Sequence, residues 1–296
     1  MPEHIYPFAT VDVFTEQRFS GNQLAVFTRA DGLTDTEMQA LAAEMNYSET
    51  TFVLPPDDTA NTARVRIFNR VSEMPFAGHP NVGTAYVLAN ANPALGDVLR
   101  FEELAGLVEV RLIRADGRVV GAEIDAPQPL QLMEELPVQE IAACLGLDMT
   151  DVVIDRHQPV RASVGIDFVL VEVTGAALSL AAPDLAAFQR IAASRREHGD
   201  RLSILIYAPE GDLVRARMFA PLAGTWEDPA TGSANAALGA LRLSLSNADH
   251  LSYDVLQGVE MGRPSRLRIR AQRRHGEIRA CVAGMCVPVF EGQARV

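Results

Sequence analysis

The 296-residue chain contains no lysine, so all 26 of its basic residues are arginine. A lysine amine is required for pyridoxal-phosphate Schiff bases and class I aldolase chemistry, and the nucleotide-binding P-loop also depends on one. The chain likewise lacks an H-E-x-x-H helix and a G-x-G-x-x-G turn after a strand. These absences remove most of the support for cofactor or metal chemistry, and we expect neither a cofactor nor a bound metal.

Cysteines and long apolar runs are equally scarce. Cys144, Cys281 and Cys286 are far apart and show no metal-ligand spacing, which is typical of a protein from a reducing cytoplasm. No apolar run approaches the length of a membrane span, and the first residues lack the pattern of a secretory signal. A net charge of −12 without a basic stripe argues against nucleic-acid and membrane partners. We therefore expect a cytoplasmic protein that binds a small molecule.

The chain does contain an apolar fraction of 48%, enough for one large core or two ordinary ones. Predicted strands and helices follow one another in the same order in both halves, with a hairpin at Asp116-Gly117 in the first half and a strand from Ser163 to Val173 in the second. Arg66-Ile67-Phe68 on a predicted strand is matched by Arg217-Met218-Phe219 at an offset of 151 residues, and Gly78 by Gly232 at an offset of 154. This agreement indicates a duplicated α+β unit, with two unrelated α+β halves as the alternative.

The predicted boundaries follow from this repeat. The first half covers residues 1–126 and the second covers residues 161–296. The prediction allows the last strand to pair with the first half instead of the second. Residues 127–160 are rich in proline and are predicted to form a linker with a short helix near Val138 to Leu145.

Fifteen residues in the second half, Trp226 to Ala240, form the most informative segment. Glu227 and Asp228 precede a proline, and Thr231-Gly232-Ser233 then opens an apolar helix. The free N–H groups and positive dipole end of such a helix start suit an anionic group, and Gly232 allows a close backbone approach. An ordinary acidic cap on a core helix is the alternative.

A similar segment in the first half runs from Met74 to Ala85 and contains Gly78 and His79. If the halves are pseudo-symmetric, the two helix starts face each other across a cleft between them. There they would hold a substrate carboxylate and stabilise the enolate-like charge that forms when a proton leaves the neighbouring carbon.

Three side chains on or beside these segments are candidate proton carriers. Glu49 follows Ser48 at the start of a predicted strand, where partial burial would raise its pKa and let it take and return a proton. His79 is constrained between a glycine and a proline. Each has an ordinary alternative: an exposed strand-end glutamate for Glu49, a packing histidine for His79 and a plain helix cap for Asp228. Other polar residues have no context that points to a site: Asn22, Glu73, His157, His198 and His250.

Taken together, the motifs resemble the PhzF-like (phenazine-biosynthesis-like) family. The resemblance extends from Val11 to about Val289, with the order and spacing of the motifs kept. It rests on Ser20-Gly-Asn-Gln-Leu-Ala-Val26, Ser48-Glu-Thr-Thr-Phe52, Phe76-Ala-Gly-His-Pro80, Phe219-Ala-Pro221, Glu227-Asp-Pro-Ala-Thr-Gly-Ser-Ala234, Gly258 and Met261-Gly-Arg-Pro-Ser265.

The resemblance implies the α+β diaminopimelate-epimerase fold, in which two pseudo-symmetric halves each wrap a barrel-like sheet around a central helix. It also implies a cofactor-independent isomerase that works by proton transfer, and a homodimer. Glu49 matches the catalytic acid/base. His79 and Asp228 match residues that assist the proton shift, and the residues expected to bind substrate are Ser48, Gly78, Thr231, Gly232 and Ser233.

Some positions differ from the patterns of the family and its relatives. Related epimerases and racemases carry a cysteine pair at the two helix starts, where this chain has Ala77 and Thr231, so two-thiol racemisation is not expected. Asn81 and Asn69-Arg70 depart from the family pattern and leave the substrate open. An epimerase, racemase or dehydratase acting on a small amino acid remains an alternative, as does a non-catalytic small-molecule binder of the same fold.

Overall fold

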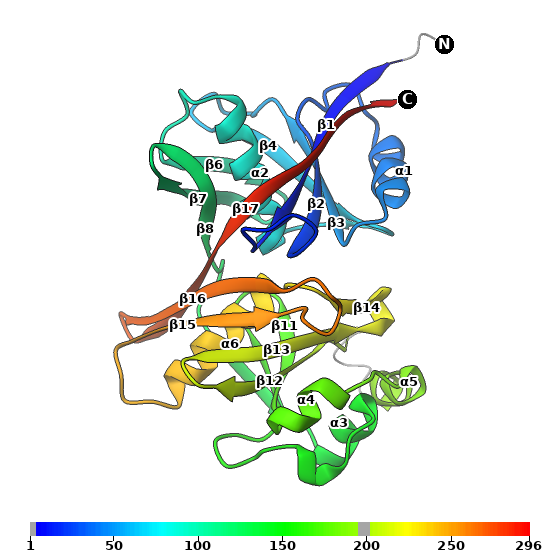
Figure 1. The fold of residues 1–296 in the computed structure, drawn as a ribbon, viewed down its shortest axis with the longest axis vertical. Helices are drawn as coiled ribbons and strands as arrows, with labels where there is room; N and C mark the ends of the chain where they lie inside the picture. Colours follow the sequence, from blue (N-terminus) through cyan, green and yellow to red (C-terminus); the bar gives the residue numbers. More distant parts are fainter. Residues whose placement is uncertain (1–3, 195–201) are drawn as a thin grey trace. The chain divides into compact units, whose positions relative to one another are not determined.

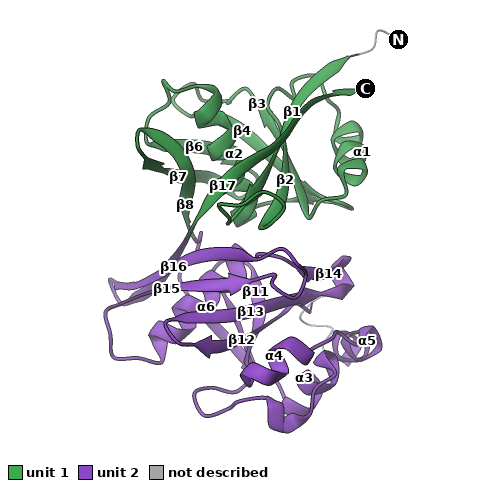
Figure 2. Ribbon diagram, in the orientation of Figure 1, with its two compact units in different colours: residues 1–125, 283–296 green, residues 126–282 purple. Residues whose placement is uncertain are grey.

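The computed structural model describes residues 4–194 and 202–296, which form two compact units (Figures 1 and 2). Unit 1 comprises Met1–Asp125 and Ala283–Val296, and unit 2 comprises Ala126–Val282. Residues 127–160, predicted from sequence to be a linker, contribute strand β9 (Gln131–Glu135) and helix α3 (Val138–Leu145) to unit 2. The final strand, β17 (Glu277–Arg295), begins in unit 2 and ends in unit 1.

The described part of unit 1 is a closed barrel of eight strands around one helix, α2. Neighbours around the barrel follow the order β1, β2, β3, β4, β6, β7, β8 and β17, and β17 pairs with β1. The β2–β3 and β4–β6 pairs are parallel. The elements are β1 (Ile5–Val13), β2 (Asn22–Phe27), α1 (Asp35–Met45), β3 (Glu49–Leu54), β4 (Ala63–Asn69), β5 (Glu73–Met74), α2 (Gly78–Ala91), β6 (Val98–Glu103), β7 (Gly106–Ala115) and β8 (Arg118–Asp125).

Unit 2 repeats this arrangement around helix α6. Its strands pair in the order β9, β10, β11, β12, β13, β15 and β16, with parallel pairs at β11–β12 and β13–β15. The beginning of β17 hydrogen-bonds to Ala126 and Leu130. The elements are η1 (Met149–Asp151), β10 (Val160–Ser163), β11 (Asp167–Glu172), α4 (Gly175–Leu180), α5 (Leu185–Ser194), β12 (Ile204–Glu210), β13 (Leu213–Ala220), η3 (Pro221–Ala223), β14 (Thr225–Asp228), α6 (Gly232–Ser244), β15 (His250–Gln257) and β16 (Ser265–Arg274).

The predicted duplication is therefore visible in the strand pairing, including both parallel pairs of each unit. In unit 2, one strand prediction was wrong in its bounds, and one short helix was not predicted. The segment from Ser163 to Val173 was expected to be one strand, but Gly165 adopts a φ of +136° between β10 and β11, so the chain turns back on itself. The short helix α4 was not expected, and it is held at its start by the side chain of Thr174.

The two central helices are buried on nearly all sides, which explains their small, apolar sequences. A methyl group added to Gly83 in α2 would lie 2.5 Å from a methyl of Leu24, and one added to Gly239 in α6 would lie 2.4 Å from a methyl of Ile269. Glycine therefore lets each barrel close tightly on its helix. Within the described residues, every helix falls short of the length or apolarity that crossing a lipid bilayer requires.

Candidate functional site

In unit 1, the starts of three elements bring four polar side chains together. Glu49 is the first residue of β3, His79 is the second residue of α2, and Asn22 begins β2. The Nδ1 atom of His79 lies 3.4 Å from Oε2 of Glu49 and 3.4 Å from Nδ2 of Asn22. Ser48 donates a hydrogen bond of 3.3 Å to Oδ1 of Asn22. The parallel pairing of β2 with β3, which sets Leu24 opposite Glu49, places these strand starts at one end of the barrel.

Burial determines the charge of His79. Only 5% of the residue is exposed, and this desolvation lowers the pKa of His79 to about 3, while a backbone contact with Gln23 acts weakly in the opposite direction. The imidazole is therefore neutral at physiological pH. Its Nε2 atom is buried and meets no hydrogen-bond partner among the described residues. Glu49 is more accessible, with 17% of its side chain exposed.

In unit 2, the residues before α6 form a second polar group. Thr231 donates a hydrogen bond of 2.5 Å from its hydroxyl to Oδ2 of Asp228, and both residues are buried. Gly232 and Ser233 are the first two residues of the helix, and Ser233 is partly exposed. The predicted site residues of unit 2 thus lie at or just before the start of its central helix, whereas unit 1 combines the start of α2 with Ser48 and Glu49, where β3 begins.

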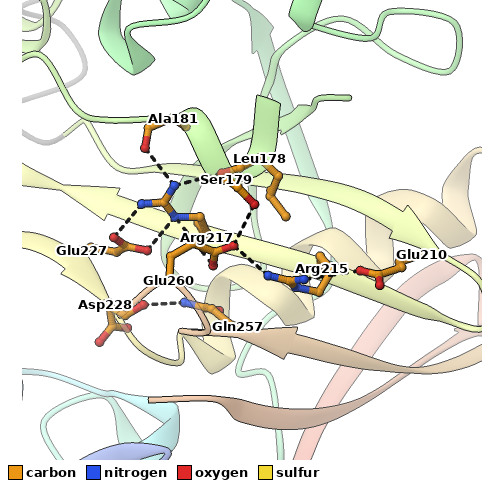
Figure 3. Close-up of polar contacts among 10 residues, drawn as sticks. All are labelled: Leu178, Ser179, Ala181, Glu210, Arg215, Arg217, Glu227, Asp228, Gln257 and Glu260. Carbon is orange, nitrogen blue, oxygen red and sulfur yellow. Dashed lines mark hydrogen bonds and ion pairs between the residues drawn. The ribbon is translucent and has the colours of Figure 1, made fainter. Parts of the chain in front are cut away.

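Gln257, the last residue of β15, connects this second group to the barrel wall. Its side-chain amide donates to the backbone oxygen of Asp228 at 2.8 Å (Figure 3) and to the hydroxyl of Thr231 at 3.1 Å. Its side-chain oxygen accepts from the backbone N–H of Thr231 at 3.2 Å and from the amide of Asn235 at 2.7 Å. One fully buried glutamine therefore fixes the start of α6.

Both helix starts have the features of an anion site. The N-cap residues are Ala77 and Thr231, and in these described turns neither side chain caps the helix. Neither first turn contains an acidic residue. Since the first N–H groups of a helix have no intrahelical partners, these starts offer hydrogen-bond donors and a positive dipole end to a ligand.

An arginine supports the segment before each helix. Arg217 forms two hydrogen bonds with Glu227, at 2.8 and 2.9 Å, and also donates to the backbone oxygens of Leu178 and Ala181 (Figure 3). Its guanidinium lies over the ring of Phe219 at 4.9 Å. The counterpart in unit 1 is Arg66, which binds Glu73 with two contacts of 2.6 Å and lies over Phe68 at 5.1 Å. The repeated Arg-x-Phe pattern is thus a structural anchor for each helix start.

Sequence reasoning missed two residues of these groups. Asn22 was set aside for lack of context, yet it bonds to Ser48 and lies beside His79; its place in the Ser20-Gly-Asn motif was the available signal. Gln257 was not considered, because nothing near it in the sequence points to the helix start. Glu73 binds Arg66, His157 bonds to Tyr207 at 2.7 Å and His250 is exposed, whereas His198 lies outside the described residues.

The cysteines belong to neither helix start: Cys144 is in α3, and Cys281 and Cys286 are in β17. Burial raises the pKa of the Cys144 and Cys286 thiols, so neither is readily ionised. Among residues 4–194 and 202–296, no three histidine, cysteine or acidic side chains gather where they could hold a metal ion.

The sequence matches a known protein family and individual relatives. Residues 11–292 match the model of the family described as phenazine biosynthesis-like protein. The chain is 37% identical to the trans-2,3-dihydro-3-hydroxyanthranilate isomerase of Pseudomonas aeruginosa, over 98% of this chain and 99% of that one.

Two solved structures share the fold. A PhzF-family phenazine biosynthesis protein of Bacillus anthracis superposes with a TM-score of 0.88 at 24% identity, covering 99% of this chain and 100% of the other. A hydroxyproline epimerase of Agrobacterium vitis superposes with a TM-score of 0.66 at 13% identity, covering 100% and 92%. The expected diaminopimelate-epimerase-like α+β fold is therefore confirmed.

Proposed function

The chain belongs to the phenazine biosynthesis-like family and is an isomerase, and we propose that it moves a proton within a small carboxylate-bearing substrate with Glu49 as the acid/base. The observation that carries this proposal is the contact of 3.4 Å between Glu49, a partly exposed carboxylate, and the buried, neutral His79. Neutral His79 gives Glu49 a hydrogen-bonding partner without a positive charge.

The proposed reaction is balanced without a redox partner. Glu49 removes a proton from a carbon atom next to an electron-withdrawing group, and the electron pair left behind spreads into the conjugated system of the substrate. Glu49, whose partly exposed carboxyl can exchange its proton with water, then protonates a different carbon, so that one double bond shifts and nothing is oxidised. Helix-start N–H groups at Gly78 and Gly232 would stabilise the negative charge that develops in between.

The remaining predicted residues receive supporting roles. His79 would orient Glu49 through the contact of 3.4 Å between its Nδ1 atom and the carboxylate. Asp228 would fix the hydroxyl of Thr231, which donates to it at 2.5 Å, while Ser48 and Ser233 contribute hydroxyls to binding. Because alanine and threonine occupy the two N-cap positions, racemisation by two thiols is disfavoured.

Solvent isotope exchange tests the proposal directly. The first probe is trans-2,3-dihydro-3-hydroxyanthranilate, the compound named for the Pseudomonas aeruginosa relative, followed by small cyclic and acyclic amino acids and hydroxy acids. In deuterium oxide, the wild-type protein is expected to incorporate deuterium into the product, detected by mass spectrometry. Glu49→Gln keeps the shape of the side chain but removes the base, so we expect a loss of turnover of at least ~10³-fold.

The matched control is Glu44→Gln, an exposed position on α1, which should keep full activity. Substrate should still raise the melting temperature of Glu49→Gln, because the helix-start donors remain. Turnover by Glu49→Gln close to that of the wild type would rule out the mechanism. Ligand-induced stabilisation without deuterium exchange for every probe would instead favour a non-catalytic binder.

The proposal includes three properties implied by the family resemblance: independence from cofactors, a cytoplasmic location and a homodimeric state. Activity that survives extensive dialysis against a chelator would agree with the first. Light scattering on a size-exclusion column would measure the oligomeric state.

A further inference from the structure

Glu103 occupies the position in unit 1 that Gln257 occupies in unit 2. Each is the last residue of its strand, β6 or β15. In the parallel β4–β6 pair Arg64 stands opposite Glu102, and in the parallel β13–β15 pair Arg215 stands opposite Leu256. Arg64 and Arg215 each lie two residues before the arginine of the repeated Arg-x-Phe motif, so they are equivalent. Their strand partners Glu102 and Leu256 are then equivalent as well, and so are the residues that follow these, Glu103 and Gln257.

The segments that these two residues face are also equivalent. Glu73, Pro75, Gly78 and Asn81 recur as Glu227, Pro229, Gly232 and Asn235. Asn81 donates to the backbone oxygen of the N-cap residue Ala77 at 3.0 Å, and Asn235 does the same to Thr231 at 3.0 Å. The two buried asparagines therefore lie alike in their helices.

The partner of the asparagine is the point at which the units differ. In unit 2, Asn235 gives its second N–H to Gln257. In unit 1, both carboxyl oxygens of Glu103 are buried, and neither reaches hydrogen-bond geometry with any group among the described residues. The amide of Asn81 is nevertheless the hydrogen-bonding group that acts on this carboxyl.

We propose that Glu103 holds the start of α2 as Gln257 holds the start of α6, and that it does so as a neutral carboxylic acid. A neutral acid has one acceptor oxygen and one O–H donor, as an amide has one acceptor and a donating nitrogen. The oxygen accepts from Asn81, as the Gln257 oxygen accepts from Asn235. The O–H takes the place of the amide nitrogen that donates to the backbone oxygen of Asp228.

The backbone segment that would accept the O–H of Glu103 supports a neutral Glu103. The unit 1 counterpart of Asp228 is Met74, since Met74 pairs with Ile67 of β4 as Asp228 pairs with Met218 of β13. The turn after Glu103 is held against this segment, because the N–H of Ala105 donates to the backbone oxygen of Pro75 at 3.0 Å. A carboxylate oxygen facing a backbone oxygen would be repelled, whereas an O–H group donates to it.

The electrostatic surroundings agree. Burial raises the pKa of Glu103 to about 8, and hydrogen bonding by Asn81 offsets this only in part. On α2, the titratable residue His79 is uncharged at neutral pH. The charged side chains of the neighbouring strands are engaged elsewhere: Arg64 with Asp57, Arg66 with Glu73 and Asp35, Glu109 with Arg100, and Arg111 with Glu123 and Asp125.

Glu103 would thus be a positioning residue for the helix start that carries Gly78 and His79. Ionisation of Glu103 would replace the donor by a buried negative charge and loosen that start. The effect on stability follows from the structure alone, whereas the effect on catalysis rests on the proposed function of Glu49 and His79.

The test compares the wild type with Glu103→Gln, which makes the two units alike. Melting temperature is measured from pH 6 to pH 9.5 without substrate. We expect the two proteins to melt within about 2 °C of each other near pH 6. Between pH 6 and about pH 8 the wild type should lose several degrees relative to the variant, because the unfolded chain has already released the Glu103 proton that the folded protein still holds, and above pH 8 the two curves should run parallel. kcat/KM of the wild type should fall by up to about tenfold per pH unit above pH 8, and this fall should be weaker in Glu103→Gln.

Two further variants complete the design. Gln257→Glu places the acid in unit 2 and should acquire a loss of melting temperature as the pH rises from 6 to 8, whereas Glu109→Gln, on the next strand, should melt like the wild type at every pH. An unchanged loss between pH 6 and pH 8 in Glu103→Gln, or failure of that variant to fold or turn over at pH 7, would overturn the proposal. A changed melting profile with an unchanged kcat/KM profile would overturn the positioning role. Activity in Glu49→Gln would refute the proposed function and leave the melting comparison intact.

Discussion

His79 lies among buried groups that leave its imidazole uncharged, and this gives the protein a specific response to acid. In the unfolded chain the imidazole takes up a proton below its ordinary pKa of 6.5, while in the folded protein it does so only near pH 3. Unfolding therefore binds an additional proton between these values, and stability must fall as the pH is lowered through this window. The slope from this residue approaches ~1.4 kcal/mol per pH unit.

We expect His79→Gln to lack this contribution. Urea unfolding at pH 7, 6 and 5 should show that the free energy of unfolding decreases less steeply in the variant than in the wild type. His250→Gln, at an exposed histidine, is the control and should follow the wild type. Parallel curves for the wild type and His79→Gln would mean that His79 takes up its proton at an ordinary pH in the folded protein.

At the scale of the element, the two arginine anchors differ in burial, and we expect them to contribute unequally to stability. The side chain of Arg217 is 8% exposed and that of its partner Glu227 is 11% exposed, against 20% and 21% for Arg66 and Glu73. Arg217 also donates to two backbone oxygens. Arg217→Met should therefore cost about 3–5 kcal/mol of stability, since it leaves a buried carboxylate without its partner. Arg66→Met should cost about 1–2 kcal/mol, because water can reach the charge left behind.

Urea denaturation of both variants measures the difference. Arg118→Met, at an exposed residue of β8, provides the control for loss of an arginine. Equal losses for Arg66→Met and Arg217→Met would show that burial does not determine the strength of these anchors.

The elements themselves were largely predictable, because alternation, caps and turn residues are local signals. The hairpin expected at Asp116 and Gly117 is present, and both residues have the positive φ that such a turn requires. The helix expected near Val138 to Leu145 has those bounds. The strand break at Gly165 was missed because an apolar run through a single glycine reads as one strand.

Only those site residues that stand out in short sequence motifs were predicted. Glu49, His79 and Ser48 come together in unit 1, but the position of Asn22 beside them depends on strand pairing. Gln257 bonds to residues 22 to 29 positions earlier in the chain, and no local pattern encodes such contacts. That both helix starts serve one substrate stays a prediction.

At the scale of the whole molecule, the repeat was readable from the sequence, while the role of the last strand could only be left open. Residues 283–296 belong to unit 1, where β17 pairs with β1 from Ile5 opposite Arg295 to Val13 opposite Cys286. By pairing with both β1 and β8, β17 completes the barrel that contains α2. Without residues 283–296, β1 would become an open edge, and the core beneath it would be exposed.

We therefore expect residues 1–125 alone to be unfolded or aggregated. Attaching residues 283–296 to the N-terminal end of this segment should restore the fold. The ends of β17 and β1 are adjacent, since His4 and Val296 exchange backbone hydrogen bonds of 3.0 and 3.1 Å. Residues 283–296, joined by an Asn-Gly turn to residues 4–125, should form a hairpin that closes the barrel. Dispersed amide signals and cooperative unfolding in this rearranged chain, but not in residues 1–125, would verify the prediction. Equal folding of both would show that the barrel does not need its last strand.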